Sequence, residues 1–205
     1  MWSQASQIVA VRAGRLFDPK SDQLLTNQVV LIRGERIEQV GPANRVEIPR
    51  ETKIIDLSRA TVRPGLIDTH LHVFVAPGGG GTLNESLQYR TLVALANAQK
   101  DLNSGFTTIC DLESEGALYG TVDLRNAINS GLVQGPRMQV AARGVHATGQ
   151  GTGGLPPNIT PPPDHLITDS PWAGRQAVRE EFMYGVDWIK IFGTYQFSFN
   201  QTAAW

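Results

Sequence analysis

The sequence predicts a mixed α/β chain in which a small all-β segment, residues 1–63, precedes a region of alternating strands and helices, residues 64–205. Two observations predict this fold class. Between residues 7 and 62, short apolar or alternating runs stop at Gly, Asp or Pro, which is typical of short strands. After Pro64, strand-like and helix-like runs alternate, and this alternation predicts βα units with a parallel sheet.

Three runs define the all-β segment: IVAVRAGRLFD (8–18), QVVLIRGERIEQVG (28–41) and TKIIDLS (52–58). The RGER sequence inside the second run predicts a hairpin turn, because Gly is favoured in tight turns between strands. The alternation along that run places Val29, Leu31 and Ile37 on a buried face. We therefore expect a small β-domain.

The α/β region has four strand-like runs, at 66–74, 106–112, 137–144 and 186–193. The segments between them predict helices over 85–105, 119–129 and 174–185. A closed (β/α)8 barrel typically takes about 250 residues. Only 142 residues lie between Pro64 and Trp205, so the region is either a small open α/β sheet or half of a barrel.

A long segment, residues 146–171, follows the third strand-like run and is rich in Gly and Pro. Loops of this length in compact domains tend to be functional or disordered. This one is expected at the carboxyl end of a strand, which is where parallel α/β folds place their sites.

Composition excludes some functions. A net charge of −1 with scattered Lys and Arg argues against nucleic-acid binding, and no apolar stretch approaches the roughly 18 residues that span a bilayer. The single cysteine excludes an intramolecular disulfide. The first residues lack a basic and apolar leader, so we expect a cytoplasmic product, although a periplasmic or secreted precursor shortened at its start would look the same.

The candidate metal ligands are His70 and His72, in the motif PGLIDTHLH. Side chains two apart on a strand share a face, so Asp68, His70 and His72 point the same way. Two neutral imidazoles near the end of a strand can bind one divalent ion. A bare His-x-His pair is a weak signal, but this pair ends an apolar strand and opens the α/β region.

Lys190 is the second candidate. In VDWIKIF the alternation places Trp188, Lys190 and Phe192 on one face. An isolated ammonium group inside a barrel is costly, so a lysine there is expected to lose its charge or to find a strong partner. A lysine at the rim, with its ammonium group in water, is the alternative.

These motifs resemble the amidohydrolase superfamily. The likeness starts at VRPGLIDTHLH (62–72) and continues through GFTTICDLES (105–114), GPRMQVAARG (135–144) and GVDWIKIFG (185–193), so that it covers most of residues 7–193. It is strongest to the branch with imidazolonepropionase-like and Xaa-Pro dipeptidase-like enzymes. The resemblance implies the first half of a TIM-type (β/α)8 barrel, about four βα units, preceded by a β-sandwich segment.

The resemblance also implies a binuclear metal site. In this branch the lysine of the fourth strand reacts with carbon dioxide, and the carbamate bridges two divalent ions; Lys190 matches that position, while His70 and His72 would hold one ion. Zinc is the expected metal. The implied reaction is hydrolysis of a C–N bond in a small molecule such as an acylated amino acid or a dipeptide.

The chain departs from the family's pattern because histidines of the fifth and sixth strands and an aspartate of the eighth are expected beyond Trp205. We therefore assign no catalytic residue within the chain and expect its site to be incomplete. The alternative is an inactive fragment or a metal-binding remnant, which would expose strand edges and form homo-oligomers.

Four further features have less specific interpretations. His146 and His165 lie in the Gly/Pro-rich segment, and neither is expected to be one of the missing ligands. His146, just past the third strand, is expected to be a solvated loop residue, and lining a substrate pocket is its alternative. Asp111 is expected to orient the loop after the second strand, and Cys110 to be a small buried residue. The run from Gly78 to Gly81 lacks the Lys-Ser/Thr of a phosphate-binding loop.

Overall fold

The computed structural model describes residues 7–75, 85–148, 150 and 165–193, and the backbone of 195–198 and 201–203. The chain divides into two compact units, Met1–Pro64 and Gly65–Trp205. The run of glycines from 78 to 81 and most of the Gly/Pro-rich segment lie outside the described residues.

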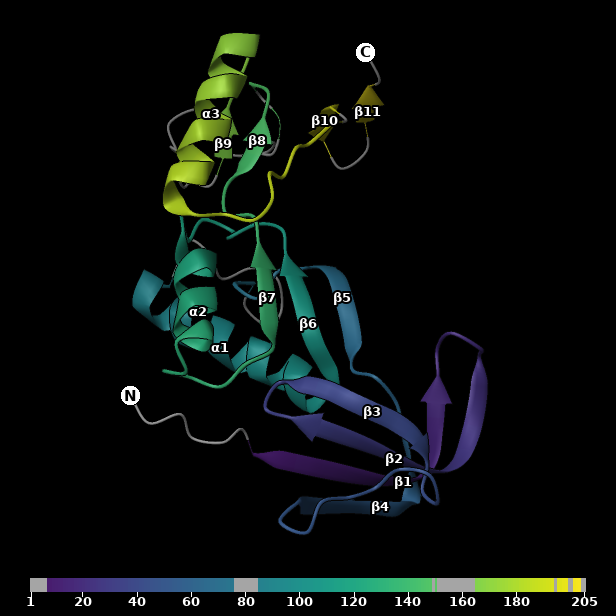
Figure 1. Cartoon of the computed structure of the whole chain (residues 1–205). Helices are drawn as coiled ribbons and strands as arrows, with labels where there is room; N and C mark the ends of the chain where they lie inside the picture. Colours follow the sequence, from purple (N-terminus) through teal and green to yellow (C-terminus); the bar gives the residue numbers. More distant parts are fainter. Residues whose placement is uncertain are drawn as a thin grey trace. The chain divides into compact units, whose positions relative to one another are not determined.

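The N-terminal unit is a four-stranded sheet (Figure 1). Its strands are β1 (Ile8–Asp18), β2 (Gln23–Arg33), β3 (Arg36–Pro42) and β4 (Lys53–Val62), in the order β3-β2-β1-β4. β1 pairs antiparallel with β2 and parallel with β4, and β2 pairs antiparallel with β3. The expected hairpin is confirmed: Arg33 pairs with Arg36 across a turn in which Gly34 has a φ of 58°, a conformation that Gly adopts at little cost.

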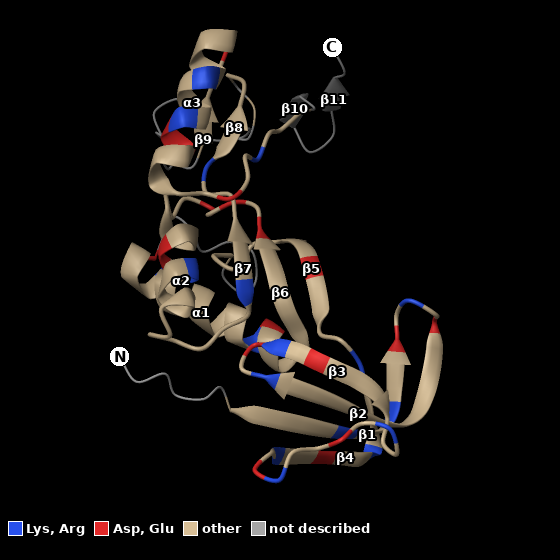
Figure 2. Cartoon of the chain, in the orientation of Figure 1, with Lys and Arg blue, Asp and Glu red and all other residues tan. Residues whose placement is uncertain are grey.

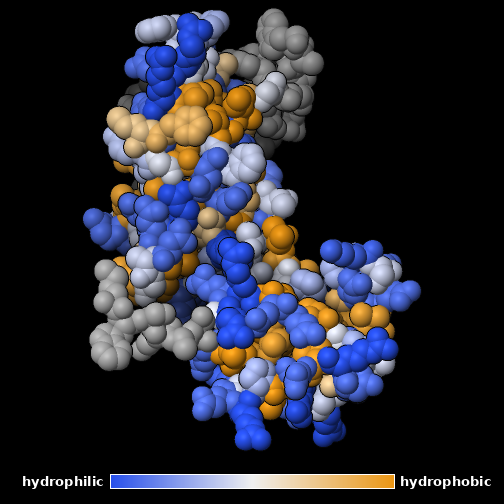
Figure 3. Space-filling view, in the orientation of Figure 1, coloured by the Kyte–Doolittle hydropathy of each residue, from blue (hydrophilic) through white to orange (hydrophobic). Residues whose placement is uncertain are grey.

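Both faces of this sheet bury apolar side chains. Val29 and Leu31 are buried with Ala10 and Val46 in one cluster, and Val30 is buried with Ala13 and Leu16 in another. The prediction that Ile37 is buried is wrong, because this side chain is 66% exposed. β3 is an edge strand, so Ile37 has a neighbouring strand on one side only. Figure 3 shows hydrophobic side chains at the surface of this unit, between charged ones.

The C-terminal unit begins with a three-stranded parallel sheet in the order β5-β6-β7: β5 (Leu66–Leu71), β6 (Phe106–Asp111) and β7 (Arg137–Val140). Helices α1 (Leu87–Asn103) and α2 (Gly120–Asn129) connect the strands and lie on one side of the sheet (Figure 1). The sequence-based prediction of two successive βα units is confirmed here.

Local sequence explains where the helices begin and end. The Ser86 side chain accepts a hydrogen bond from the backbone N–H of Tyr89 at the start of α1. Helix α3 (Pro171–Tyr184) begins after Ser170, whose side chain accepts from Ala173 N–H, and it ends at Gly185 with a φ of 87°. All three helices lie close to the predicted ranges.

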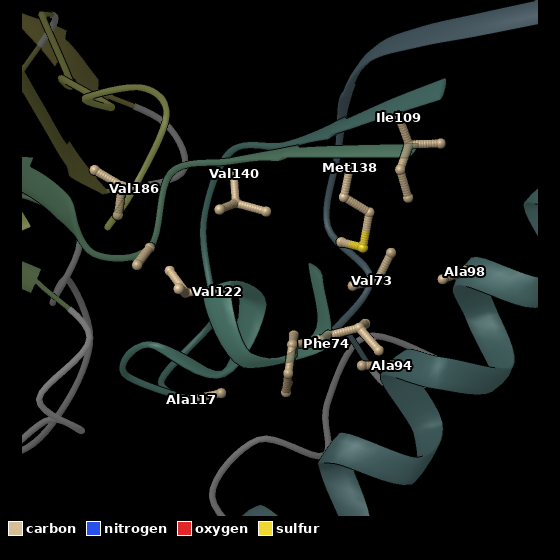
Figure 4. Close-up of a cluster of buried hydrophobic side chains, with 12 residues drawn as sticks. Val73, Phe74, Ala94, Ala98, Ile109, Ala117, Val122, Met138, Val140 and Val186 are labelled. Atoms are coloured by element: carbon tan, nitrogen blue, oxygen red, sulfur yellow. The ribbon is translucent and has the colours of Figure 1, made fainter. Parts of the chain in front are cut away.

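A single apolar cluster fills the space between the sheet and the two helices (Figure 4). Met138 and Ile109 project from β7 and β6 toward Val73, which follows β5 (Figure 4). Ala94 and Ala98 of α1 are fully buried against them. Small residues on the helix allow close approach to the strands, so the cluster holds β5, β6 and their carboxyl-terminal loops in fixed relation.

Beyond β7 the observed elements differ from the predicted ones. The expected strand 137–144 is broken: β7 ends at Val140, and the three-residue β8 (Gly144–His146) pairs in parallel with β9 (His165–Ile167). The break has a side-chain cause, because Glu181 of α3 accepts hydrogen bonds from the backbone N–H groups of Ala142 and Arg143. The Glu181 side chain therefore binds the backbone N–H groups that a neighbouring strand would otherwise pair with.

The prediction of a regular strand over 186–193 is also wrong. In the structure this stretch forms a single parallel bridge between Val145 and Ile191, although Val145 N–H donates to Lys190 O and Phe192 N–H to Val145 O. The Asp187 carboxylate accepts a hydrogen bond from Val140 N–H, so a side chain takes the place of a backbone partner there. The same carboxylate forms an ion pair with Arg125. A short hairpin, β10 (Tyr195–Ser198) and β11 (Gln201–Ala203), follows.

The described part of the chain is thus mixed α/β, and its strands form open sheets. Lys and Arg residues are dispersed among Asp and Glu along the ribbon (Figure 2). None of the described helices is long and apolar enough to cross a membrane.

Candidate metal centre

The end of β5 positions the two candidate histidines. Asp68 accepts a hydrogen bond from the backbone N–H of His70, which fixes the backbone at this point. His70 is exposed and His72, just past the strand, is half-buried. Their ring centroids are 5.3 Å apart at an interplanar angle of 72°. The two imidazoles therefore lie side by side, as the alternation along the strand predicts.

The structure brings Lys190 to this pair. Its Nζ lies 3.5 Å from Nε2 of His70, although 120 positions separate the two residues in the sequence. The same Nζ lies 4.9 Å from the ring centroid of Phe192, a cation–π contact. The stretch 186–193 is not a regular strand, yet it places Lys190 and Phe192 on one side, as predicted.

The surroundings of His70 favour the neutral form of its imidazole ring. Burial lowers the pKa of His70, and the positive charges of Lys190 and His72 lower it further, while Asp68 acts in the opposite direction. Neutral imidazole is the form that binds metal ions. Among the described residues, no carboxylate lies within ion-pair distance of Lys190, so its charge is not compensated locally.

His72 has its own orienting contacts. Its Nδ1 lies 3.4 Å from the carbonyl oxygen of Glu113 and 3.5 Å from a carboxylate oxygen of Glu115. Such acceptors favour the tautomer with the proton on Nδ1, which leaves the Nε2 lone pair available to a metal ion.

Asp111 at the end of β6 ties these loops together. It is fully buried and accepts hydrogen bonds from Val73 N–H at 3.2 Å and from Glu113 N–H at 3.3 Å. The prediction that it orients the loop after this strand is confirmed. Burial raises the pKa of Asp111 to about 8, against the effect of the two hydrogen bonds. Cys110, beside it, is partly rather than fully buried.

A second constellation was missed in the sequence. Glu113, His146 and His165 offer ligand atoms that all lie within 4.8 Å of one another. The prediction that His146 is a solvated loop residue is wrong, because this side chain is 2% exposed at the end of β8. His165 begins β9 and is half-buried. A three-residue strand carries too little pattern to be predicted, although the apolar HLI at 165–167 was a weak sign.

Aromatic packing fixes this second group. The ring of His146 stacks on that of Phe192, with centroids 4.0 Å apart, and contacts the ring of His165 at 3.9 Å with a tilt of 40°. Burial alone would raise the pKa of Glu113, but hydrogen bonds and charge from His146 and His165 outweigh it and lower the pKa to about 2. Glu113 is thus a carboxylate at neutral pH.

Comparison with known proteins agrees with this architecture. The amidohydrolase family matches residues 61–204. Among solved structures, the chain resembles a Xaa-Pro dipeptidase with bound methionine (28% identity, TM-score 0.80, 92% of this chain and 48% of the other). It also resembles a prolidase in complex with N-methylphosphonate-L-proline (29% identity, TM-score 0.79, 92% and 47%).

Curated relatives match a shorter stretch. A dihydroorotase of Anaeromyxobacter sp. is 33% identical over 107 residues, which are 51% of this chain and 21% of the relative. An imidazolonepropionase of Pseudomonas savastanoi is 29% identical over 111 residues, 53% of this chain and 27% of the relative. The chain thus spans about half the length of the solved structures and about a fifth to a quarter of these curated relatives. With the ordered motifs and the fold, the match over 61–204 shows that this chain belongs to the amidohydrolase family.

Proposed function

We propose that this chain supplies the first part of a metal-dependent hydrolase that cleaves C–N bonds in a small substrate, such as an acylated amino acid or a dipeptide. The observation that carries the proposal is the approach of Lys190 Nζ to within 3.5 Å of His70 Nε2, beside His72. Relatives that bear on the substrate are the Xaa-Pro dipeptidase, the dihydroorotase and the imidazolonepropionase. The family fold further supports a TIM-type barrel for the whole protein.

The donor set suits divalent zinc. Imidazole nitrogens bind borderline metal ions well, and the lowered pKa of His70 keeps its ring in the binding form. We propose that His70 and His72 hold one ion and that Lys190, carboxylated on Nζ, bridges it to a second. Carboxylation converts the Lys190 cation into an anion, which removes the repulsion between Lys190 and a bound cation.

Bound ions of this kind polarise a substrate carbonyl and lower the pKa of a water molecule. The chain's own residues have the positioning roles. Asp111 holds the loop backbones at Val73 and Glu113, and Glu113 O with Glu115 orients the ring of His72. Phe192 packs against Lys190 and shields one side of its Nζ. We assign no proton-transferring residue within the chain.

The test compares zinc binding with and without bicarbonate, because a carbamate needs carbon dioxide. In titration calorimetry, we expect bicarbonate to strengthen zinc binding to the wild-type chain at least about tenfold. Lys190→Gln abolishes this dependence, and Lys190→Glu, which supplies a carboxylate, restores part of the affinity. Lys53→Gln, in β4, is the matched control and leaves binding unchanged. Bicarbonate-independent binding that Lys190→Gln does not alter would contradict the proposal.

A metal-binding chain without catalytic activity is the second candidate. It is favoured by the open sheets that the described residues form. Under this alternative the 205-residue chain binds zinc but hydrolyses neither acylated amino acids nor dipeptides. Turnover by the chain itself, lost in His70→Asn, would exclude it.

A further inference from the structure

The group of Glu113, His146 and His165 shares no residue with the proposed centre and comes from three segments. Glu113 is in the loop after β6, His146 ends β8 and His165 begins β9. Glu113 and His146 are 5% and 2% exposed. Phe192 contacts both groups: Lys190 lies against its ring, and His146 stacks on it.

Distances within the group lie at the long end of hydrogen bonding and also match the spacing of ligands on one metal ion. Oε1 of Glu113 lies 3.4 Å from Nε2 of His146 and 3.4 Å from Nδ1 of His165. Protein N–H···O hydrogen bonds are usually about 2.7–3.2 Å long. Ligand atoms on a tetrahedral zinc ion with bonds of about 2.05 Å are about 3.4 Å apart. The two contacts of Glu113, each 3.4 Å long, match this separation between zinc ligands.

The hydrogen bonding of His146 is poor for a buried imidazole. Nδ1 of its ring is buried and has no hydrogen-bond partner among the residues that the structure describes, and the contact of Nε2 with Glu113 is long. Buried polar groups normally have at least one well-formed partner. The long contact thus leaves Nε2 without a well-formed hydrogen bond, and a metal ion bound to Nε2 would give that nitrogen a partner.

Gly144 leaves space beside the ligand atoms. A Cβ at this position would lie 2.8 Å from Nε2 of His146 and 2.8 Å from the ring of Phe192, and closer still to Oε1 of Glu113. Gly144 is not among the described glycines with positive φ, so its backbone does not itself require glycine. The missing side chain instead keeps the space next to both ligand atoms open.

We infer that Glu113, His146 and His165 bind one divalent transition-metal ion, of the zinc class, at a site separate from His70, His72 and Lys190. Two imidazoles and one carboxylate are a common donor set for such ions. The three ligands come from the loop after β6, from β8 and from β9, so a bound ion would join that loop to the short β8–β9 pair. This inference does not depend on the hydrolase proposal.

The first experiment leaves the cluster intact. In the double variant His70→Asn/His72→Asn of the 205-residue chain, the ligands of the other centre are removed. We expect this variant to retain one tightly bound zinc ion per chain after gel filtration, measured by atomic emission. We also expect Co²⁺ bound to it to give the intense visible absorption of a tetrahedral ion. A double variant that retains no zinc and gives no such spectrum would overturn the inference.

The second experiment alters the cluster in the same double-variant background. Glu113→Gln and His165→Asn each remove a ligand, and Gly144→Ala fills the space; each is expected to weaken zinc binding at least about tenfold. Gly174→Ala, where an added Cβ meets nothing within 4 Å, is the matched control and leaves binding unchanged. Zinc affinity that stays the same in all three cluster variants would place the ion elsewhere and reject the site.

Discussion

At the residue scale, Asp111 has the clearest structural role in the candidate centre. It is the only side chain among the described residues that accepts hydrogen bonds from the backbone after both β5 and β6. Its full burial means that water cannot replace it when it is removed. The geometry of His72 and Glu113 therefore depends on one carboxyl group that need not touch metal or substrate.

We predict that Asp111→Ala lowers the free energy of unfolding by about 2–4 kcal/mol, because two buried N–H groups lose their acceptor. Urea denaturation of the metal-free chain measures this. Asp56→Ala is the control: Asp56 also accepts from a backbone N–H, that of Ser58, but is exposed, so the cost should stay below about 1 kcal/mol. Equal effects of the two substitutions would mean that the hydrogen bonds of Asp111 are dispensable.

At the element scale, helix α3 carries a buried carboxyl group, that of Glu181, which accepts hydrogen bonds from the backbone between β7 and β8. Glu181 is fully buried, and burial raises its pKa, while the N–H groups of Arg143 and Ala142 oppose the shift. A raised folded-state pKa means that the native state holds its proton more tightly than the unfolded state does.

The stabilising contribution of this proton is therefore complete below the unfolded-state pKa of about 4.5 and is lost as pH rises through the higher folded-state pKa. We predict that the free energy of unfolding falls with rising pH in this window, and that Glu181→Gln flattens the profile. Denaturation of both proteins at a series of pH values is the measurement. A variant whose profile parallels that of the wild type would assign the pH dependence to other groups.

The two glycines of α3 allow a paired test of helix geometry. Gly185 ends the helix with a φ of 87°, so Gly185→Ala should destabilise the chain by about 1 kcal/mol. Gly174 lies inside the helix with open space around it, so Gly174→Ala should stabilise by up to about 1 kcal/mol. Thermal unfolding should show melting temperatures that move in opposite directions; a shift in the same direction would contradict this description of the helix end.

The elements that the sequence predicted are the long ones. β1, the Gly34 hairpin, α1 and α2 have clear periodicity and local start or stop signals, and all lie near the expected residues. The short elements beyond β7 were not predictable, because Glu181 and Asp187 replace backbone partners from far along the chain. The burial of His146 was not predictable either, because its partner strand, β9, lies in the Gly/Pro-rich segment.

At the scale of the whole molecule, the N-terminal unit has several apolar side chains at its surface. Six large hydrophobic residues there are at least 38% exposed: Leu24, Ile37, Val40, Ile54, Ile55 and Leu57. An apolar groove of about 920 Å³ runs over the same sheet and includes Ile37 and Val40. Contiguous exposed apolar surface favours association.

We therefore propose that the 205-residue chain self-associates through this sheet, and we predict that Ile37→Lys raises the dissociation constant at least about tenfold in sedimentation equilibrium. Leu132→Lys is the control, since Leu132 is 78% exposed in the C-terminal unit and should have no effect. A monomeric wild-type chain over the accessible concentration range would disprove this proposal.

The proposed function rests on the convergence of His70, His72 and Lys190, and locating bound zinc in a crystal tests this convergence. Crystals of the chain grown with zinc and bicarbonate allow anomalous diffraction at the zinc absorption edge. We expect an anomalous peak within bonding distance of His70 and His72, with density for a carboxylate on Lys190 Nζ beside it. Absence of anomalous density at these three residues would show that they do not form a metal site.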